Sequence, residues 1–143
     1  MRLQSAIFVP EEAFGSETEE EKKVLSLLRM EGVWLYAVTA LSREEAEQSL
    51  RRLGAEEAFR GILCASETGL SLTDGEIYLR AARRLRSEPE DTVVFAGRTA
   101  TLRGAKTAGF RTAAVKGAAV AEEWEALRAE ADETVERYAD FLA

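Results

Sequence analysis

The chain has 143 residues, with 19 basic and 26 acidic side chains, a net charge of -7 and no histidine. A chain of this length buries one compact core, and we expect a single domain over residues 1–143. The negative charge repels a phosphate backbone and argues against a nucleic-acid partner. The absence of histidine excludes Ser-His-Asp catalysis and metal sites built on histidine.

The sequence carries no sign of export or of a membrane span. Residues 1–5 lack the apolar region of a signal peptide, and no stretch of about 18 apolar residues occurs. The one cysteine, Cys64, has no partner for an internal disulfide and is expected to be a core thiol, since no histidine is present to activate it. We therefore expect a cytoplasmic protein without a membrane partner.

Short apolar segments predict the strands, which cover residues 6–9, 33–38, 61–65, 92–95 and 111–115. They do not alternate in polarity, which is typical of strands buried on both faces of a sheet. Trp34 and Tyr36 fall within one of these segments, so both are expected in the core.

Helical periodicity fills the intervals, in the segments 19–30, 42–53, 75–85, 101–108 and 121–131. Ser42 and Glu45 have the spacing of a capping box, and Gly109 stands where a helix C-cap would be. Repeated strand-helix units predict an α/β three-layer sandwich, with a Rossmann-like parallel sheet of about five strands and helices on both faces. Trp124, flanked by glutamates on the last helix, is expected to be half exposed and available for a contact.

In such a sheet ligands bind beyond the carboxyl ends of the strands, so the residues that follow each strand bear on function. The segments 6–8, 38–39, 74–82, 93–95 and 105–109 together resemble the haloacid dehalogenase-like (HAD) hydrolase superfamily. The resemblance implies a phosphoryl-transfer fold in which four motifs meet at the strand ends.

The first motif of that family is Asp-x-Asp, in which one Asp attacks phosphorus and the other protonates the leaving group. Val9 and Glu11 stand at these positions, and valine has no nucleophilic atom. The second motif is a Thr or Ser that holds the phosphoryl oxygens, and Thr39 matches it. A simpler role for Thr39 is to cap the helix that follows.

The third motif is a Lys that neutralises the phosphate, and Leu72 stands in its place, followed by Asp74 as the expected cap of the next helix. The fourth motif supplies acids that bind Mg²⁺. The corresponding residues are Ala96, Gly97 and Arg98, so we expect the Mg²⁺ site to be lost and no other cofactor. The Arg98 guanidinium could hold an anion near the vacated metal position, or form a surface ion pair.

The 30 positions from Val9 to Thr39 leave no room for a large cap domain, which implies a capless member. The leading hypothesis is a catalytically inactive HAD-like protein, a pseudoenzyme, whose strand ends bind a small anion or a protein partner through Thr39 and Arg98. One alternative is a divergent hydrolase that uses Glu11 with Thr39 and Arg98. Another is a structural module that forms a homodimer.

Overall fold

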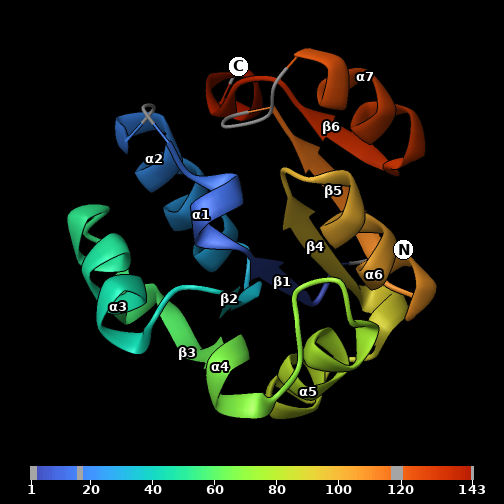
Figure 1. The fold of residues 1–143 in the computed structure, drawn as a ribbon. Coiled ribbons are helices and arrows are strands. Elements are labelled where there is room, and N and C mark those ends of the chain that lie inside the picture. The colour runs from blue at the N-terminus through green and yellow to red at the C-terminus, as the bar shows by residue number, and fades with distance from the viewer. Residues whose placement is uncertain (1–2, 16–17, 117–120, 143) are drawn as a thin grey trace.

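A computed structural model describes residues 3–15, 18–116 and 121–142. Within these residues, six strands form one parallel sheet in the order β3-β2-β1-β4-β5-β6 (Figure 1). The strands are β1 (Ser5–Phe8), β2 (Trp34–Thr39), β3 (Phe59–Cys64), β4 (Thr92–Ala96), β5 (Arg111–Val115) and β6 (Glu133–Val135). Since β1 pairs with β2 on one side and β4 on the other, the residues that follow β1 lie beside the ends of both neighbours.

Helices cover both faces of the sheet, with α2 and α3 on one face and α5, α6 and α7 on the other (Figure 1). The α-helices of the described residues are α1 (Pro10–Ala13), α2 (Thr18–Met30), α3 (Arg43–Arg52), α4 (Ala65–Thr68), α5 (Gly75–Leu85), α6 (Thr99–Thr107) and α7 (Ala121–Glu130). The described residues also form the short 3-10 helices η1 (Glu56–Ala58), η2 (Pro89–Asp91) and η3 (Tyr138–Leu142). The predicted three-layer α/β sandwich is confirmed.

The sheet has one strand more than the expected number of about five. Strand β6 has three residues with the sequence Glu-Thr-Val, so it contains no apolar run that would mark it as a strand. It forms because its backbone extends the sheet beside β5, where only Val135 reaches the core. The helices α1 and α4, of four residues each, were also missed, since one helical turn has no periodicity.

Each face of the sheet has its own apolar core. On the α2 face, the Phe8 ring stacks on Phe95 with ring centroids 4.3 Å apart, and also on Phe14 at 5.2 Å. On the opposite face, Val9 packs with Ile77 of α5. Both faces of β1 are therefore buried, as the unbroken apolar sequence predicts.

The two tryptophans differ from expectation in opposite directions. Trp34 is 50% exposed, because it opens β2 at the margin of the sheet, and the Arg60 guanidinium lies 4.3 Å above its ring. Trp124 is only 4% exposed and packs with Leu102 and Leu127 in a third apolar cluster. The predictions of a core Trp34 and a half-exposed Trp124 are thus both wrong.

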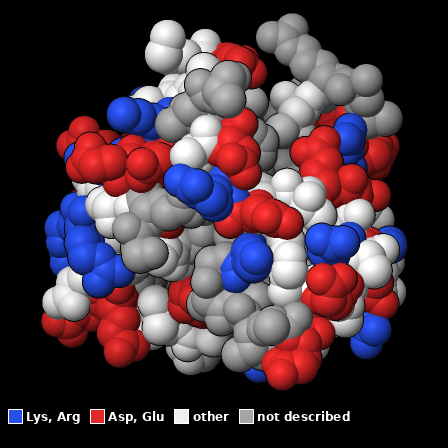
Figure 2. Space-filling view, turned by 90° about the horizontal axis from the view of Figure 1, so that it is seen from above, with Lys and Arg blue, Asp and Glu red and all other residues white. Residues whose placement is uncertain are grey.

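Among the described residues, no helix combines the length and apolar character that a membrane span requires. Figure 2 shows acidic and basic side chains interspersed over the face that it draws.

Candidate functional site

The carboxyl ends of β1, β2 and β4 meet at one edge of the sheet, where the sequence predicted a site. Val9 follows β1 directly and is fully buried in the core on the α5 face. Its carbonyl accepts hydrogen bonds from the amides of Glu12 and Ala13, at 2.9 and 2.8 Å, and Pro10 begins the short helix α1. Position 9 therefore presents no polar side-chain atom to a ligand.

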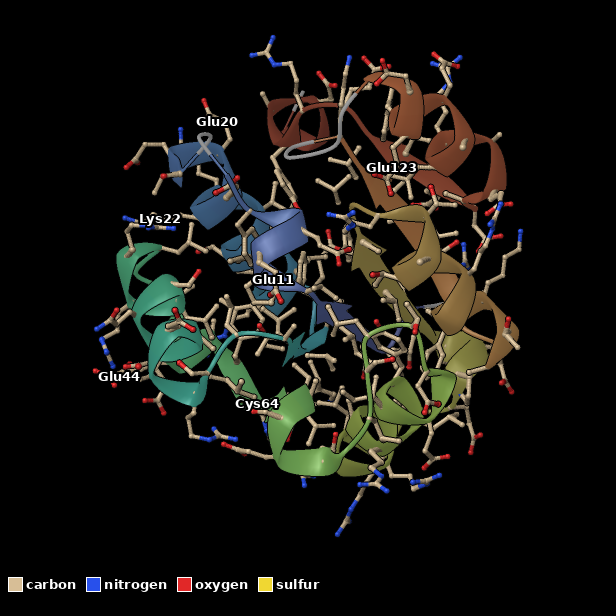
Figure 3. The ribbon with its side chains drawn as sticks, viewed as in Figure 1. Glu11, Glu20, Lys22, Glu44, Cys64 and Glu123 are labelled. Carbon is tan, nitrogen blue, oxygen red and sulfur yellow. The ribbon has the colours of Figure 1, made fainter. Side chains whose placement is uncertain are left out.

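Glu11 projects from α1 at the centre of this edge (Figure 3) and turns toward β2. Its Oε1 accepts a hydrogen bond of 2.6 Å from the hydroxyl of Thr39, and its Oε2 accepts one of 2.7 Å from the amide of Ala40. Thr39 is fully buried, and its Oγ1 in turn accepts from the Leu41 amide at 3.0 Å. The structure thus brings together two residues that the sequence had singled out separately, Glu11 and Thr39.

Thr39 does not cap the helix that follows it. The N-cap of α3 is Ser42, whose Oγ accepts from the Glu45 amide at 3.2 Å, while the Glu45 carboxylate accepts from the Ser42 amide at 3.1 Å. The predicted capping box is therefore confirmed, and the hydroxyl of Thr39 is used by Glu11 instead.

Glu12 turns the other way, toward β4 and α6, and is 5% exposed. Its Oε1 accepts from the Gly97 amide at 3.0 Å, and its Oε2 accepts from the Thr101 hydroxyl at 2.8 Å. Burial raises the pKa of Glu12, an effect that the hydrogen bonds from Thr101 and Gly97 oppose and the nearby Glu11 charge reinforces. The role of Thr101 was missed, because no motif of the sequence marks a hydroxyl inside α6.

The end of β4 and the residues after it, positions 96–98, have little room for an added acid. The Ala96 side chain is fully buried in the cluster of Leu102 and Trp124, and so points away from the site. A Cβ atom on Gly97 would lie 2.5 Å from the carbonyl oxygen of Glu12. Only position 98 of this segment bears a side chain in an open place.

Arg98 occupies that place and is exposed. Its positive charge is close enough to Glu12 to lower the pKa of that carboxyl, although burial outweighs this effect. It makes no ion pair within the described part of the chain, so the surface ion pair considered for it does not occur there. Beside it, the Thr99 amide at the start of α6 donates to Glu123 at 2.9 Å.

The loop before α5 supplies no cation. Leu72 is partly buried and packs against the core on the α5 face, where its carbonyl accepts a hydrogen bond from the Tyr78 hydroxyl. Burial, reinforced by the charges of Glu12 and Glu11, holds the pKa of Tyr78 far above its ordinary range. Asp74 caps α5 as predicted, since its Oδ1 accepts from the Glu76 amide at 3.1 Å.

An open hollow of about 540 Å³ adjoins Glu11 between α1 and α3. Leu41 and Phe14 contribute apolar surface to it, while Glu45 and Arg52 bring charges of opposite sign. The hollow is therefore of mixed polarity. Among the described residues, no group of three or more acidic, cysteine or histidine side chains is arranged to hold a metal ion.

Comparisons with known proteins show which family and fold this chain shares. A family model described as "Haloacid dehalogenase-like hydrolase" matches residues 12–115. A "Glyceraldehyde 3-phosphate phosphatase" of Methanopyrus kandleri is 33% identical over 93 residues, which cover 64% of this chain and 40% of that protein. A "Phosphorylated carbohydrates phosphatase" of Thermotoga maritima is 31% identical over 89 residues, 62% of this chain and 41% of that protein. The matched segments thus span about two fifths of these relatives' lengths.

Solved structures share the fold. A putative beta-phosphoglucomutase from Thermotoga maritima superposes with a TM-score of 0.72 at 27% identity, covering 85% of this chain and 53% of that one. The core domain of a putative phosphoglycolate phosphatase from Streptococcus pneumoniae superposes over 99% of this chain and 94% of that one, with a TM-score of 0.72 at 16% identity. The match of the family model over most of the sequence shows that this chain belongs to the haloacid dehalogenase-like hydrolase family.

Proposed function

We propose that this chain is a HAD-like protein that lacks the covalent phosphoryl-transfer chemistry of its family and acts by binding. The observation that carries the proposal is the position of Glu11, whose carboxylate accepts hydrogen bonds from the Thr39 hydroxyl and the Ala40 amide. In the family these donors are expected to hold the phosphoryl oxygens. In this chain an internal carboxylate takes the place of the ligand.

The nucleophile position supports the proposal. Val9 has no atom that could attack phosphorus, and it is fully buried. Cys64, at the end of β3, is the one thiol of the chain and is also fully buried. Burial raises the pKa of Cys64 more than the nearby Arg43 charge lowers it, so the nucleophilic thiolate is disfavoured. Neither residue replaces the missing aspartate.

The balance of charge at the strand ends is also unfavourable for a phosphate ester. Glu11 and Glu12 bring two carboxyl groups to the place where a dianion would bind, and like charges repel. Leu72 supplies no positive charge from the loop before α5, and Arg98 is the cation whose charge reaches Glu12. An anion that binds here would have to displace Glu11 and pair with Arg98.

The residues present do not fit Mg²⁺. A small hard cation needs several oxygen ligands in near-octahedral order. All four carboxylate oxygens of Glu11 and Glu12 accept hydrogen bonds from protein donors, and the two carboxylates turn toward opposite halves of the sheet. A side chain at Gly97 would collide with the Glu12 backbone. We therefore propose a protein without the family's Mg²⁺ site, and derive no catalytic step through the metal.

A second candidate is a divergent phosphatase that uses Glu11 with Thr39 and Arg98. Two observations favour it. The Glu11 Oε1 atom lies 2.6 Å from the Thr39 hydroxyl oxygen, and two relatives are named as phosphatases. Such an enzyme would use Glu11 as a general base or acid on a bound ester, with no covalent intermediate. The cytoplasmic location predicted from the sequence remains a prediction under either candidate.

The two candidates are separated by turnover of p-nitrophenyl phosphate by the purified chain, with Mg²⁺ and with a chelator. The first candidate predicts no turnover above background under either condition. Turnover that follows the protein through purification and is lost in Glu11→Ala would support the second. Glu44→Ala is the matched control, because Glu44 is exposed on the neighbouring helix α3.

A further inference from the structure

A further hollow lies on the α2 face of the sheet, and its lining includes none of Val9, Glu11, Thr39 and Arg98. A cavity of about 240 Å³ opens between α2 and the β4-β5-β6 half of the sheet. Val24, Leu27 and Leu28 of α2 form one wall, and Val93 and Phe95 of β4 form the floor. Leu27 is 38% exposed, so this wall is open to solvent on one side.

The far wall of the cavity is charged. Arg111 is the register partner of Val93, so it lies beside this apolar floor at the start of β5. Its guanidinium lies 3.7 Å from the Glu133 carboxylate at the start of β6, which is too long for a hydrogen bond. The two side chains are 38% and 59% exposed. The cavity is therefore apolar within and ends at a loosely paired cation.

Size and charge together define the class of ligand. An apolar cavity of about 150 Å³ is large enough to hold benzene, whereas pockets for drug-sized ligands begin near 300 Å³. The volume of this cavity, about 240 Å³, lies between these two values. Arg111 favours a negative group at the open end, because its present partner is distant and solvated.

We propose that this cavity binds a small monocarboxylate with an apolar chain, the size of hexanoate, whose carboxylate pairs with Arg111. The hydrocarbon chain contacts Leu27, Leu28 and Phe95. Glu133 weakens binding of the ligand, since its carboxylate competes for Arg111 and repels the carboxylate of the ligand. The site is independent of Glu11 and Thr39, so it does not depend on the proposed function.

Binding is tested by titrating hexanoate and 1-hexanol into the whole chain with isotope-labelled methyl groups, followed by NMR. The proposal predicts saturable shifts of the Val24, Leu27 and Leu28 methyls, and none of Val38, which lies in the core on the opposite face. Shortening hexanoate by one methylene should weaken binding about fourfold. The absence of saturable shifts on the lining methyls would overturn the proposal.

Variants of the charged wall test the role assigned to it. Arg111→Gln should weaken hexanoate binding about threefold or more, and Glu133→Gln should strengthen it by a similar factor, with 1-hexanol unchanged in both. Both positions are partly exposed, so neither change disturbs the core. Arg128→Gln and Glu125→Gln, an exposed pair on α7, are the matched controls. Equal affinity for hexanoate and 1-hexanol in all variants would contradict the proposal. So would a dimer of this chain that covers the Leu27 methyl, because the cavity would then be closed by the second copy.

Discussion

The Glu11 carboxylate and the Thr39 hydroxyl, 28 positions apart in the chain, are joined by a hydrogen bond of 2.6 Å. This bond ties the residues after β1 to the end of β2. The next residue, Glu12, makes the corresponding connection to the other neighbour of β1, through the Gly97 amide and the Thr101 hydroxyl. Two consecutive glutamates thus accept hydrogen bonds from donors on both sides of the central strand.

Glu12 should make the stability of the protein depend on pH. Burial raises its folded-state pKa above the unfolded value of 4.5, so the folded state binds the proton more tightly. The stability from this group is fully present below pH 4.5 and is lost as the pH rises through the folded pKa. Glu12→Gln removes the titration, so urea unfolding from pH 4 to 8 should show the variant gaining stability relative to the unmodified protein as the pH rises.

A pH-independent difference between Glu12→Gln and the unmodified protein would contradict that account. Glu12→Ala is the companion variant, because it leaves the buried Gly97 amide and Thr101 hydroxyl without their acceptor. We expect it to cost about 1–3 kcal/mol of unfolding free energy. Glu44→Ala on the exposed surface of α3 should change stability by less than about 0.5 kcal/mol.

Gly97 should tolerate no side chain. Gly97→Ala places a Cβ atom 2.5 Å from the Glu12 carbonyl oxygen, and that oxygen belongs to backbone that cannot swing aside. We expect a loss of about 1–3 kcal/mol in thermal or urea unfolding, as for an overpacked core. Gly15→Ala is the control, since a Cβ there meets nothing within 4 Å. Equal stability of the two variants would mean that the backbone at Glu12 yields more easily than the structure indicates.

The cost in stability of introducing an acid at the end of β4 or just after it should depend on the position chosen. Ala96→Asp would bury a carboxyl among Leu102 and Trp124, so we expect it to cost at least about 2 kcal/mol and to give no metal binding. Arg98→Asp changes an exposed side chain at the N-cap of α6, where Asp is a favoured residue, and should not lower stability. The unfolding free energies of the two variants, from urea unfolding curves, are compared with that of the unmodified protein. An Ala96→Asp variant as stable as the unmodified protein would show that the Ala96 side chain does not face the core.

The two tryptophans give a spectroscopic check of the packing. In Trp34→Phe only Trp124 remains, which is 4% exposed, so acrylamide should quench its fluorescence weakly. In Trp124→Phe the remaining Trp34 is 50% exposed and should be quenched strongly. Stronger quenching of Trp124 than of Trp34 would agree with the exposures expected from the sequence. It would contradict the packing of α7 against the sheet.

The fold could be predicted because its central strands are apolar throughout and its helices carry local signals. Ser42 with Glu45, and Asp74 before α5, act within one helical turn, and both caps are present as expected. Strand β6 could not be predicted, because its pairing with β5 depends on backbone contacts, and its sequence has no apolar pattern that indicates a strand. Trp34 was misjudged for a related reason, since exposure at a strand's first residue depends on what packs over it.

The site was predicted only in part. The sequence located Val9, Glu11 and Thr39 at neighbouring strand ends, and they lie there. It could not show that Glu11 bonds to Thr39 or that Glu12 reaches Thr101, because such contacts depend on side-chain direction after a one-turn helix. The steric conflict at Gly97 likewise depends on the approach of two backbone segments that are 85 positions apart.

The most direct test of the central claim is a titration of inorganic phosphate into the unmodified chain and into Glu11→Ala, followed by calorimetry. If Glu11 fills the place of a ligand, its removal frees the Thr39 hydroxyl and the Ala40 amide and removes a repelling charge. We predict no measurable binding to the unmodified chain or to the Glu44→Ala control, and millimolar binding to Glu11→Ala that is lost again in Glu11→Ala with Thr39→Val. Equal binding of phosphate to the unmodified chain and to Glu11→Ala would contradict the claim.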